Sequence, residues 1–307
     1  MHSQISVILA TYNGERFIKA QLDSILSQNL KPAEIIVSDD HSTDNTVGLL
    51  QKYMADKLLC MHSNSDEPGV ISNFKSAAKS VTPGNYIAFA DQDDIWNQDK
   101  LAVSYQYLSS IEQPGLPCVV YSDPEVINEA GECIHASLWD ILGYSNYAHT
   151  LETVLFGNPA GGLTMLINPE LSNYISTIPN NGYMHDAWLT LCAYTFGCAA
   201  IAPGPLVKYR QHANNVTFST NYKQVSRMGR IGKEVLNALK GKSDLFEEQI
   251  LFVKQFYACF KEQIPTEKAR LFEAFIGLQG SSYLKKKIAF RKAMKIAQRV
   301  KEQPGSN

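Results

Sequence analysis

Short apolar runs alternate with amphipathic stretches through the first third of the chain. Three runs, at residues 5–10, 35–37 and 86–90, are rich in β-branched and aromatic residues and short enough to form buried strands. Between them the apolar residues recur with a period near 3.6, which is typical of amphipathic helices. The predicted helices cover residues 15–28, about 43–53, 70–81 and 98–111, and a weaker strand covers 57–62. This alternation predicts an α/β fold in which right-handed crossover helices flank a mostly parallel sheet.

Beyond Pro114 the pattern becomes mixed. Residues 119–121 and 163–167 are predicted to be strands, with a long irregular stretch between them, and residues 185–196 are predicted to be a helix. From about residue 222 the remaining chain has a helical pattern, with breaks near residues 241–243, 265 and 277–280. We therefore expect two parts, an α/β domain over residues 1–218 and a helical region over residues 219–307.

The composition is that of a folded globular protein. The chain has 307 residues, of which 45% are hydrophobic and 19% are charged, enough for one large domain or two unequal ones. No apolar run approaches the roughly 18 residues that span a bilayer. The six cysteines are scattered and form no Cys-x-x-Cys pair, which argues against a structural zinc site or a disulfide framework. These features favour a protein of the reducing cytoplasm.

Charge is distributed unevenly along the chain, although the net charge is only −2. Residues 1–220 contain 10 Lys and Arg against 22 Asp and Glu, a balance of −12. Residues 221–307 contain 18 against 8, a balance of +10. Such an asymmetry indicates separate tasks for the two parts, and the basic part is expected to face an anionic partner.

The acidic run Asp91-Gln92-Asp93-Asp94 directly follows the apolar strand at 86–90. Three carboxylates so close together raise one another's pKa unless a cation neutralises them. Mg2+ takes oxygen ligands from one or two carboxylates and completes its shell with substrate phosphates and water. In an open α/β sheet, ligands bind beyond the carboxyl ends of the strands, where this run falls. The run therefore predicts a metal site for a phosphate-bearing substrate. A turn or a helix cap, with Asp94 capping a helix near Asn97, would explain the same residues.

Other strand ends also carry polar residues. Thr11, Tyr12 and Asn13 follow the first strand, and Asp39 and Asp40 follow the second. Because the carboxyl ends of parallel strands meet at one edge, these residues and the acidic run are expected to share one crevice. A nucleobase would lie against Tyr12 while Asp39 accepts a hydrogen bond from a base N–H; alternatively, Asp40 is a turn residue. The chain has no Gly-x-Gly-x-x-Gly turn, no P-loop and no His-Glu-x-x-His, which excludes those nucleotide and zinc sites.

These segments resemble the family 2 glycosyltransferases of the GT-A fold. The resemblance is carried by SVILATYNG at 6–14, VSDDHSTD at 37–44 and FADQDDIW at 89–96, and it covers roughly residues 3–215. It implies a GT-A nucleotide-diphospho-sugar transferase fold with a helical C-terminal extension. By this likeness the first two motifs hold the nucleoside, and the Asp-x-Asp motif binds Mg2+ or Mn2+ on the diphosphate. The implied nucleotide-binding residues are Thr11, Tyr12, Asn13, Glu15, Asp39, Asp40, Asp91 and Arg210, and the implied metal ligands are Asp91, Asp93 and His212.

A fourth motif, MHDAWL at 184–189, resembles the family segment that supplies the catalytic base, which implies Asp186. Inverting displacement of a nucleoside diphosphate needs a carboxylate that takes the proton from the acceptor hydroxyl. The alternative is that Asp186 only favours a helix N-terminus through the helix dipole. The segment 209–215 resembles the closing segment of the family, which implies that Arg210 and His212 can reach the diphosphate, a role that suits the forked donors of arginine. GNPAGG at 157–162 resembles a loop near the sugar or acceptor, unless it is a turn. The residues expected near the sugar or acceptor are Asp94, Trp96, Asn158, Gly161, His185 and Trp188.

Two positions depart from the pattern of the family. His41 stands at a variable position where glycine is frequent, and Ala187 stands where a second tryptophan is common in close relatives. The second departure leaves the acceptor specificity open. The style of the sequence resembles the rhamnosyltransferase-like branch, which implies dTDP-rhamnose as the donor, with UDP-hexoses next.

The C-terminal segment 284–301 contains eight basic residues and no acidic one. An imperfect apolar stripe along it is formed by Leu284, Ile288, Phe290, Met294, Ala297 and Val300. A basic amphipathic helix can lie on an anionic membrane surface, or it can pack on neighbouring helices. The resemblance implies membrane association, because many relatives glycosylate a polyprenyl-linked saccharide at the inner leaflet. We expect a cytoplasmic protein, peripheral at the inner face of the membrane, and no nucleic-acid partner, because no nucleic-acid module is recognisable.

The leading hypothesis is an inverting, metal-dependent glycosyltransferase that acts in bacterial surface polysaccharide assembly. It would move one sugar from a nucleoside diphosphate to a saccharide acceptor. A second hypothesis is a non-catalytic protein that binds a sugar nucleotide or a saccharide on the same scaffold, against which the intact Asp91, Asp93 and Asp186 argue. A third, nucleotidyl transfer to a sugar phosphate, would need a glycine-rich, arginine-bearing loop after the first strand, where this chain has TYNGER at 11–16.

Overall fold

The apolar runs of the sequence form one large mixed sheet. Its strands are β1 (Ile5–Thr11), β2 (Glu34–Asp39), β3 (Cys60–Ser63), β4 (Tyr86–Asp91), β6 (Cys118–Tyr121), β9 (Leu166–Ile167) and β10 (Cys198–Ile201). They lie in the order β10-β6-β9-β4-β1-β2-β3, and every pair is parallel except those made by β9, which is antiparallel to both β4 and β6. Most side chains of β1, β4 and β6 are buried, because helices cover both faces of the sheet. The predicted mostly parallel sheet is confirmed.

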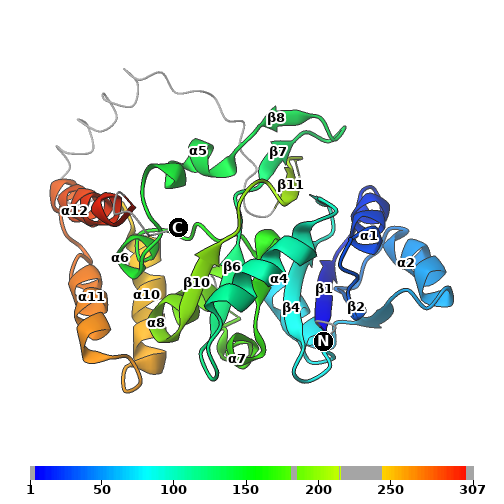
Figure 1. Cartoon of the computed structure of the whole chain (residues 1–307), viewed down its shortest axis with the longest axis horizontal. Coiled ribbons are helices and arrows are strands. Elements are labelled where there is room, and N and C mark those ends of the chain that lie inside the picture. The colour runs from blue at the N-terminus through cyan, green and yellow to red at the C-terminus, as the bar shows by residue number, and fades with distance from the viewer. Residues whose placement is uncertain (1–3, 181–184, 214, 216–243, 302–307) are drawn as a thin grey trace. The chain divides into compact units, whose positions relative to one another are not determined.

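The register of the central strands brings their carboxyl ends together. β1 pairs with β2 so that Thr11 lies opposite Asp39, and with β4 so that Ala10 lies opposite Asp91. In Figure 1 these three strands end at the upper edge of the sheet. The loops that follow them therefore begin side by side, as expected for parallel strands.

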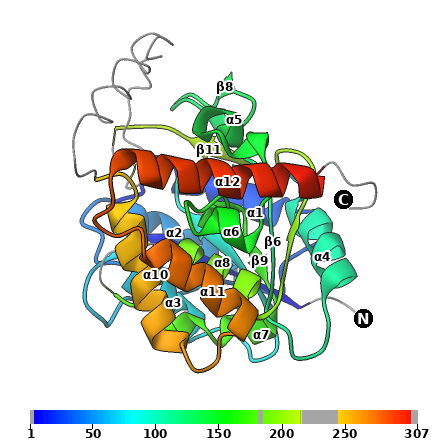
Figure 2. The same ribbon diagram turned by 90° about the vertical axis from the view of Figure 1, so that its left-hand side faces the viewer.

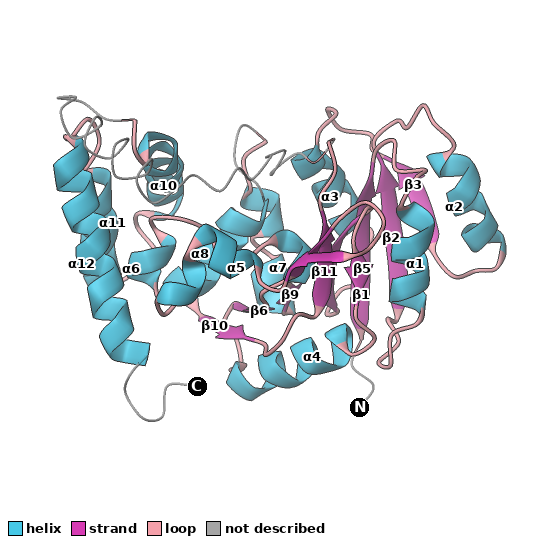
Figure 3. Cartoon of the chain, turned by 90° about the horizontal axis from the view of Figure 1, so that it is seen from above, coloured by secondary structure: helices cyan, strands magenta, loops and turns pink. Residues whose placement is uncertain are grey.

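The helices of this unit lie on both faces of the sheet. They are α1 (Ile18–Leu26), α2 (Thr46–Ala55), α3 (Val70–Ala78), α4 (Lys100–Ile111), α5 (Leu138–Leu142), α7 (Pro169–Ser172) and α8 (His185–Phe196), with 3-10 turns η2 (Gly162–Thr164) and η3 (Ile175–Thr177). α3 and α4 cover opposite faces (Figure 3). α3 buries Ile71, Phe74 and Ala77, and α4 buries Leu101 and Leu108, so each helix turns its apolar side inward.

A smaller sheet lies at the carboxyl edge of the large one. Its strands are β5 (Ile95–Trp96), β7 (Glu125–Ile127), β8 (Cys133–His135) and β11 (Val207–Arg210), in the order β5-β11-β7-β8. β11 is antiparallel to β5 and parallel to β7. Because β5 directly follows the acidic run, this pairing brings the end of β11 next to that run.

Several predicted elements differ from the observed ones, and the stretch after residue 121, predicted to be irregular, contains β7, β8 and α5. The helix predicted at 15–28 begins only at Ile18, because the backbone N–H groups of Phe17 and Ile18 both donate to the carbonyl of Gly14 and close a turn. The strand predicted at 163–167 is shorter, because Gly162–Thr164 forms a 3-10 turn and only Leu166–Ile167 pairs in the sheet.

The chain divides into two compact units, Met1–Leu142 with Ala160–His212, and Gly143–Pro159 with Ala213–Asn307. The computed structural model describes residues 4–180, 185–213, 215 and 244–301. For residues 299–301 it describes the backbone only. The predicted boundary between residues 218 and 219, and the helical pattern expected between 222 and 243, lie outside the described residues.

The second unit is helical, with an aromatic core. It contains η1 (Tyr144–Asn146), α6 (Leu151–Val154), α10 (Glu247–Phe260), α11 (Thr266–Ile276) and α12 (Tyr283–Lys301). α12 runs across the view in Figure 2, with α6 beside it. The ring of Phe156 lies 5.2, 4.8 and 5.4 Å from the rings of Phe246, Phe275 and Phe290. Among the helices that the structure describes, none is both long and apolar enough to cross a membrane.

The apolar stripe predicted along 284–301 is split between two sides of α12. Met294 and Ala297 are buried, whereas Leu284 and Ile288 are 56% and 65% exposed. The six apolar residues span too wide an arc for one helix face, so the helix packs with one part of the stripe and leaves the other outside. The side chain of Val300 lies outside the described residues.

Candidate active site

Asp39 ties the loops after β1 and β2 together. Thr11 Oγ1 donates to Asp39 Oδ1 at 2.8 Å. Ser42 donates twice, from its backbone N–H to Oδ2 at 2.8 Å and from its hydroxyl to Oδ1 at 2.6 Å. Asp39 is only 2% exposed, and these three donors compensate the burial of its carboxylate. A carboxylate has about four acceptor positions, so one on Oδ2 remains for a further donor such as a base N–H.

Asp40 is built into the wall of the same edge. Its Oδ1 accepts a hydrogen bond from Asn64 Nδ2 and its Oδ2 accepts one from the N–H of Gly69, both at 2.8 Å. Asp40 therefore fixes the segment after β3, which agrees with the turn interpretation and leaves a direct nucleotide contact as a prediction.

The loop after β1 is fastened to its neighbours on both sides. Asn13 accepts a hydrogen bond from the N–H of Thr43 at 2.8 Å, and Glu15 accepts one from the N–H of Asn45 at 2.8 Å. On the other side, Gln92 Oε1 accepts from the Tyr12 N–H and Gln92 Nε2 donates to the Tyr12 carbonyl, both at 2.9 Å. The Tyr12 ring is left 56% exposed at the crevice, where a nucleobase can stack on it.

Gly14 lies where this loop passes the Gln92 side chain. A Cβ at Gly14 would lie 2.2 Å from Gln92 Oε1. The sequence placed Gln92 between two acidic residues without giving it a role, and nothing local marks a hydrogen bond to a residue 80 positions away.

The acidic run contacts the end of β11. His212 Nε2 lies 2.8 Å from Asp93 Oδ2, with side chains that are 10% and 15% exposed. Arg210 donates from its backbone N–H to Asp94 Oδ1 at 2.9 Å and from Nε to the Asp93 carbonyl at 2.8 Å. Two of the three predicted metal ligands, Asp93 and His212, are thus brought into contact.

Asp91 lies close enough to the other carboxylates to feel their charge. Burial, followed by the negative charges of Asp93 and Asp186, raises the pKa of Asp91 to about 7. A divalent cation at this point would remove the repulsion. In the structure, two predicted metal ligands, Asp91 and Asp93, and the predicted catalytic base Asp186 therefore form one electrostatic cluster.

The available donors fit a divalent cation whose coordination shell is completed by the substrate. Among the described residues, no group of three His, Cys, Asp or Glu side chains is arranged as a ready-made metal site. Mg2+ is commonly held by one or two carboxylates together with substrate phosphates and waters. Asp91 and Asp93 would provide those carboxylates, and the repulsion that raises the pKa of Asp91 is the feature that a cation would relieve.

Beneath the run lies a buried lysine that the sequence analysis missed. Lys100 is 1% exposed, and its Nζ lies 3.3 Å from the centroid of the Trp96 ring. Burial lowers the pKa of Lys100 well below its usual value, while Asp94 and Asp91 act in the opposite direction. Lys100 is the only Lys or Arg between residues 80 and 207, a signal that was available in the sequence.

Asp186 lies in the first turn of α8 and accepts hydrogen bonds from two backbone N–H groups. The Gly162 N–H donates to Asp186 Oδ2 at 3.0 Å, and the Ala187 N–H donates to Oδ1 at 2.6 Å. A Cβ at Gly162 would lie 2.5 Å from His185 Nε2, so the loop passes closely over the start of the helix. Gly161 belongs to this loop and to the first unit, whereas Asn158 belongs to the second.

Four residues expected near the acceptor are core residues. Asp94, Trp96, His185 and Trp188 are at most 3% exposed. The His185 ring lies 4.3 Å from that of Phe74 and 4.9 Å from that of Phe89, and burial lowers its pKa to about 3, so it is neutral. All four side chains are buried in the core, and a direct acceptor contact stays a prediction.

Arg210 also points into the protein. It is 3% exposed, and its Nη1 donates to the carbonyls of Asn128 and Glu129 at 3.1 and 2.8 Å. The ring of Phe17 lies 4.8 Å from the guanidinium carbons of both Arg16 and Arg210, and 5.1 Å from the His212 ring. In this arrangement Arg210 anchors the small sheet, and the predicted diphosphate contact stays a prediction.

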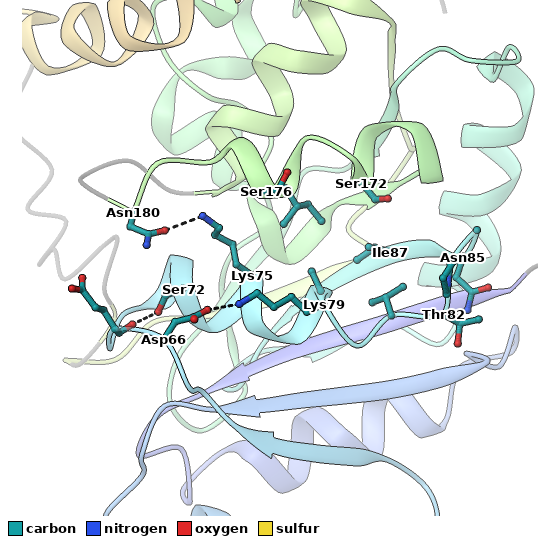
Figure 4. Close-up of a pocket in the computed structure, with 16 residues that line it drawn as sticks. Asp66, Ser72, Lys75, Lys79, Thr82, Asn85, Ile87, Ser172, Ser176 and Asn180 are labelled. Carbon is teal, nitrogen blue, oxygen red and sulfur yellow. Dashed lines mark hydrogen bonds and ion pairs between the residues drawn. The ribbon is translucent and has the colours of Figure 1, made fainter. Parts of the chain in front are cut away.

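A cavity of about 650 Å3 lies elsewhere, between α3 and the α7–η3 segment. Figure 4 shows Lys75 directed at Asn180 and Lys79 directed at Asp66 within it. None of the predicted site residues lines this cavity, and its two lysines already have partners. The predicted site residues therefore lie at the sheet edge and not in this cavity.

Comparisons with known proteins identify the family of the chain. The sequence profile described as "Glycosyl transferase family 2" matches residues 6–165. The dTDP-rhamnosyl transferase RfbG of Shigella flexneri is 29% identical over 235 residues, which cover 71% of this chain and 78% of that protein. The UDP-Glc:alpha-D-GlcNAc-diphosphoundecaprenol beta-1,3-glucosyltransferase WfaP of Escherichia coli is 31% identical over 135 residues, 40% of this chain and 53% of that protein.

A solved structure is similar over the whole chain. The mannosyltransferase PcManGT from Pyrobaculum calidifontis, in complex with GDP-Man and Mn2+, has a TM-score of 0.58 at 18% identity, covering 100% of this chain and 77% of that one. At this identity the likeness concerns the fold alone.

Proposed function

Because the chain belongs to glycosyl transferase family 2 and has the predicted GT-A fold, we propose that it is an inverting, metal-dependent glycosyltransferase. It moves one sugar from a nucleoside diphosphate to a saccharide acceptor during assembly of a cell-surface polysaccharide. The observation that carries the proposal is the convergence of three carboxylates, since the charges of Asp93 and Asp186 both act on Asp91.

Asp91, Asp93 and His212 are the residues that would hold Mg2+ or Mn2+. The cation, when bound, neutralises negative charge on the departing diphosphate. His212 is fixed for this role by its 2.8 Å contact with Asp93 Oδ2 and by its packing on Phe17. Asp39 and Tyr12 lie on the nucleoside side of the same edge, where one acceptor position and one exposed ring are available.

Asp186 acts as the general base. Its carboxylate is oriented by the N–H groups of Gly162 and Ala187, and the positive end of the α8 dipole favours its ionised form. The carboxylate takes the proton of the acceptor hydroxyl as the hydroxyl oxygen bonds to the anomeric carbon. The diphosphate leaves on the opposite side, so the anomeric configuration inverts.

The relatives suggest the donor and the acceptor. Their names specify dTDP-rhamnose or UDP-glucose as donors, and for one of them an undecaprenol-linked acceptor. We propose dTDP-rhamnose first and UDP-glucose second, with a saccharide on a polyprenyl diphosphate as the acceptor. Such an acceptor places the reaction at the inner face of the cell membrane.

The first test is thermal unfolding with dTDP-, UDP- and GDP-sugars, each with Mn2+, Mg2+ or EDTA. A donor at 100 times its dissociation constant should raise the melting temperature by roughly 5–10 °C, and only with metal. The proposal is refuted if no nucleotide sugar shifts the melting temperature of the wild-type protein.

Transfer assays then address the two roles separately. Asp93→Ala should lose both the metal-dependent shift and transfer. Asp186→Asn should keep the shift and lose transfer by at least 100-fold. The exposed Asp56→Asn serves as the control and should behave like the wild type. Normal turnover in Asp186→Asn would exclude that residue as the base.

A further inference from the structure

The outward side of α12 combines large aliphatic residues with positive charge. Leu284, Ile288 and Ile296 are 56%, 65% and 45% exposed. Residues 284, 288, 291 and 295 follow one another at helical spacings of four, three and four, so they share one face. Leu284 and Ile288 therefore lie on the same exposed face as Arg291 and Lys295, which are exposed as well.

The flanking stripe has the same character. Lys285, Lys292 and Ile296 are exposed and recur at spacings of seven and four. No acidic residue occurs in this helix. On its other side, α12 is anchored inside its own unit, because the fully buried Lys286 pairs with Glu247. The exposed side of the helix therefore presents three aliphatic residues, four basic residues and no acidic residue.

We infer that this face docks on an anionic lipid surface. An interfacial helix buries its apolar side chains at the boundary between headgroups and acyl chains, while flanking Lys and Arg meet the negative headgroups. Leu284, Ile288 and Ile296 supply the first contact, and Lys285, Arg291, Lys292 and Lys295 supply the second. A lipid surface offers acyl chains and negative headgroups along the whole length of a helix. In water, the aliphatic side chains stay exposed at a cost in free energy.

This inference differs from the prediction made from the sequence in the residues that it assigns. The sequence grouped Leu284 and Ile288 with Phe290, Met294 and Ala297, which face the protein. Membrane contact therefore depends on the other side of the helix, with Ile296 in place of Met294. Vesicle binding does not depend on the proposed sugar transfer, although a lipid-linked acceptor would give the docking its purpose.

The test is sedimentation of the full chain with vesicles of phosphatidylcholine alone and of phosphatidylcholine with 30% phosphatidylglycerol. The wild type should bind the anionic vesicles, release as salt rises, and ignore the neutral ones. The pair Leu284→Ser with Ile288→Ser should lower binding at least tenfold. The pair Arg291→Gln with Lys295→Gln should lower it by about fivefold for each charge removed.

Leu251→Ser is the matched control, because Leu251 is 53% exposed on α10 of the same unit but lies off this face. It should bind like the wild type, and melting temperatures should show that every variant is folded. The inference is overturned if the wild type does not bind anionic vesicles, or if both α12 double variants bind them as strongly as the wild type does. Self-association of the wild type that Ile288→Ser abolishes would assign the face to a second copy and also overturn it.

The failure of this inference and of the proposed function can be told apart. Transfer to a water-soluble acceptor should be unchanged in the α12 variants, since none of the altered residues belongs to the carboxylate cluster. Vesicle binding without any transfer would count against the enzyme proposal alone.

Discussion

Replacing Asp91 by asparagine should stabilise the metal-free protein at neutral and alkaline pH. The pKa of Asp91 is about 7 in the folded protein, against 3.8 for the free side chain. Between these values the folded chain keeps a proton that the unfolded chain has lost, so the free energy of unfolding falls as the pH rises. The loss starts near pH 4 and is complete above pH 7. Asparagine carries no charge at any pH and escapes this penalty.

The size of the effect follows from the two pKa values. Their difference corresponds to about 4 kcal/mol, and solvent contact of the partly exposed carboxyl reduces this to roughly 2 kcal/mol. For a chain of this size, such a change raises the melting temperature by roughly 4–8 °C. The advantage of Asp91→Asn should therefore be small at pH 4.5 and reach this range at pH 8.

The assay is thermal unfolding in EDTA at pH 4.5, 6 and 8, with Asp56→Asn as the control. The exposed Asp56 should give an offset that is the same at pH 6 and pH 8. Saturating Mn2+ at pH 8 should stabilise the wild type and not Asp91→Asn, because the metal needs the ionised carboxylate. A constant advantage at all three pH values, or lower stability of Asp91→Asn at pH 8, would refute the repulsion argument.

Three further substitutions test the packing around the site. Gly14→Ala places a methyl group 2.2 Å from Gln92 Oε1, so the Gln92 amide must move away from Tyr12. The loss of its two hydrogen bonds should lower the free energy of unfolding by about 1–2 kcal/mol. An unchanged melting temperature would contradict this expectation. Phe17→Ala removes the ring that packs on His212 and should weaken Mn2+ binding in a calorimetric titration, whereas Phe17→Tyr should preserve it; equal affinities would rule out this positioning role. Gly162→Ala places a methyl group 2.5 Å from the His185 imidazole and should lower kcat at least tenfold, with little change in the KM for the donor. A normal kcat would show that the loop has room to shift.

The central strands and the acidic run could be predicted because their signals are local. Continuous apolar runs at 5–10 and 86–90 give buried parallel strands, and polar residues at their ends necessarily meet at one edge. The positions of Asp39, Asp91 and Asp93 follow from this rule alone. Asp186 needed the family resemblance, because its own stretch of sequence reads only as a helix start.

The contacts that assemble the site are long-range and have no local signal. Gln92 and Tyr12 are joined across 80 positions, and Arg210 meets Asp94 across 116. The sequence predicted that Arg210 would reach a phosphate because its forked donors suit that role. Instead, the pairing of β11 with β7 places Arg210 beside the carbonyls of Asn128 and Glu129. Period alone also could not separate the inner and outer apolar residues of α12, because both recur at helical spacing.

The two-residue strand β9 has a consequence for synthesis of the chain. β1 to β4 are complete once residue 91 has been made, but the second neighbour of β4 is Leu166–Ile167. About 75 further residues must be added before that partner exists, which takes roughly 4–15 s at ordinary rates of translation. During this time the apolar edge of β4 presents unpaired backbone groups to any other extended chain. The nascent chain therefore passes through an aggregation-prone interval that ends only when β9 pairs with β4, and His212, the partner of Asp93, is made later still.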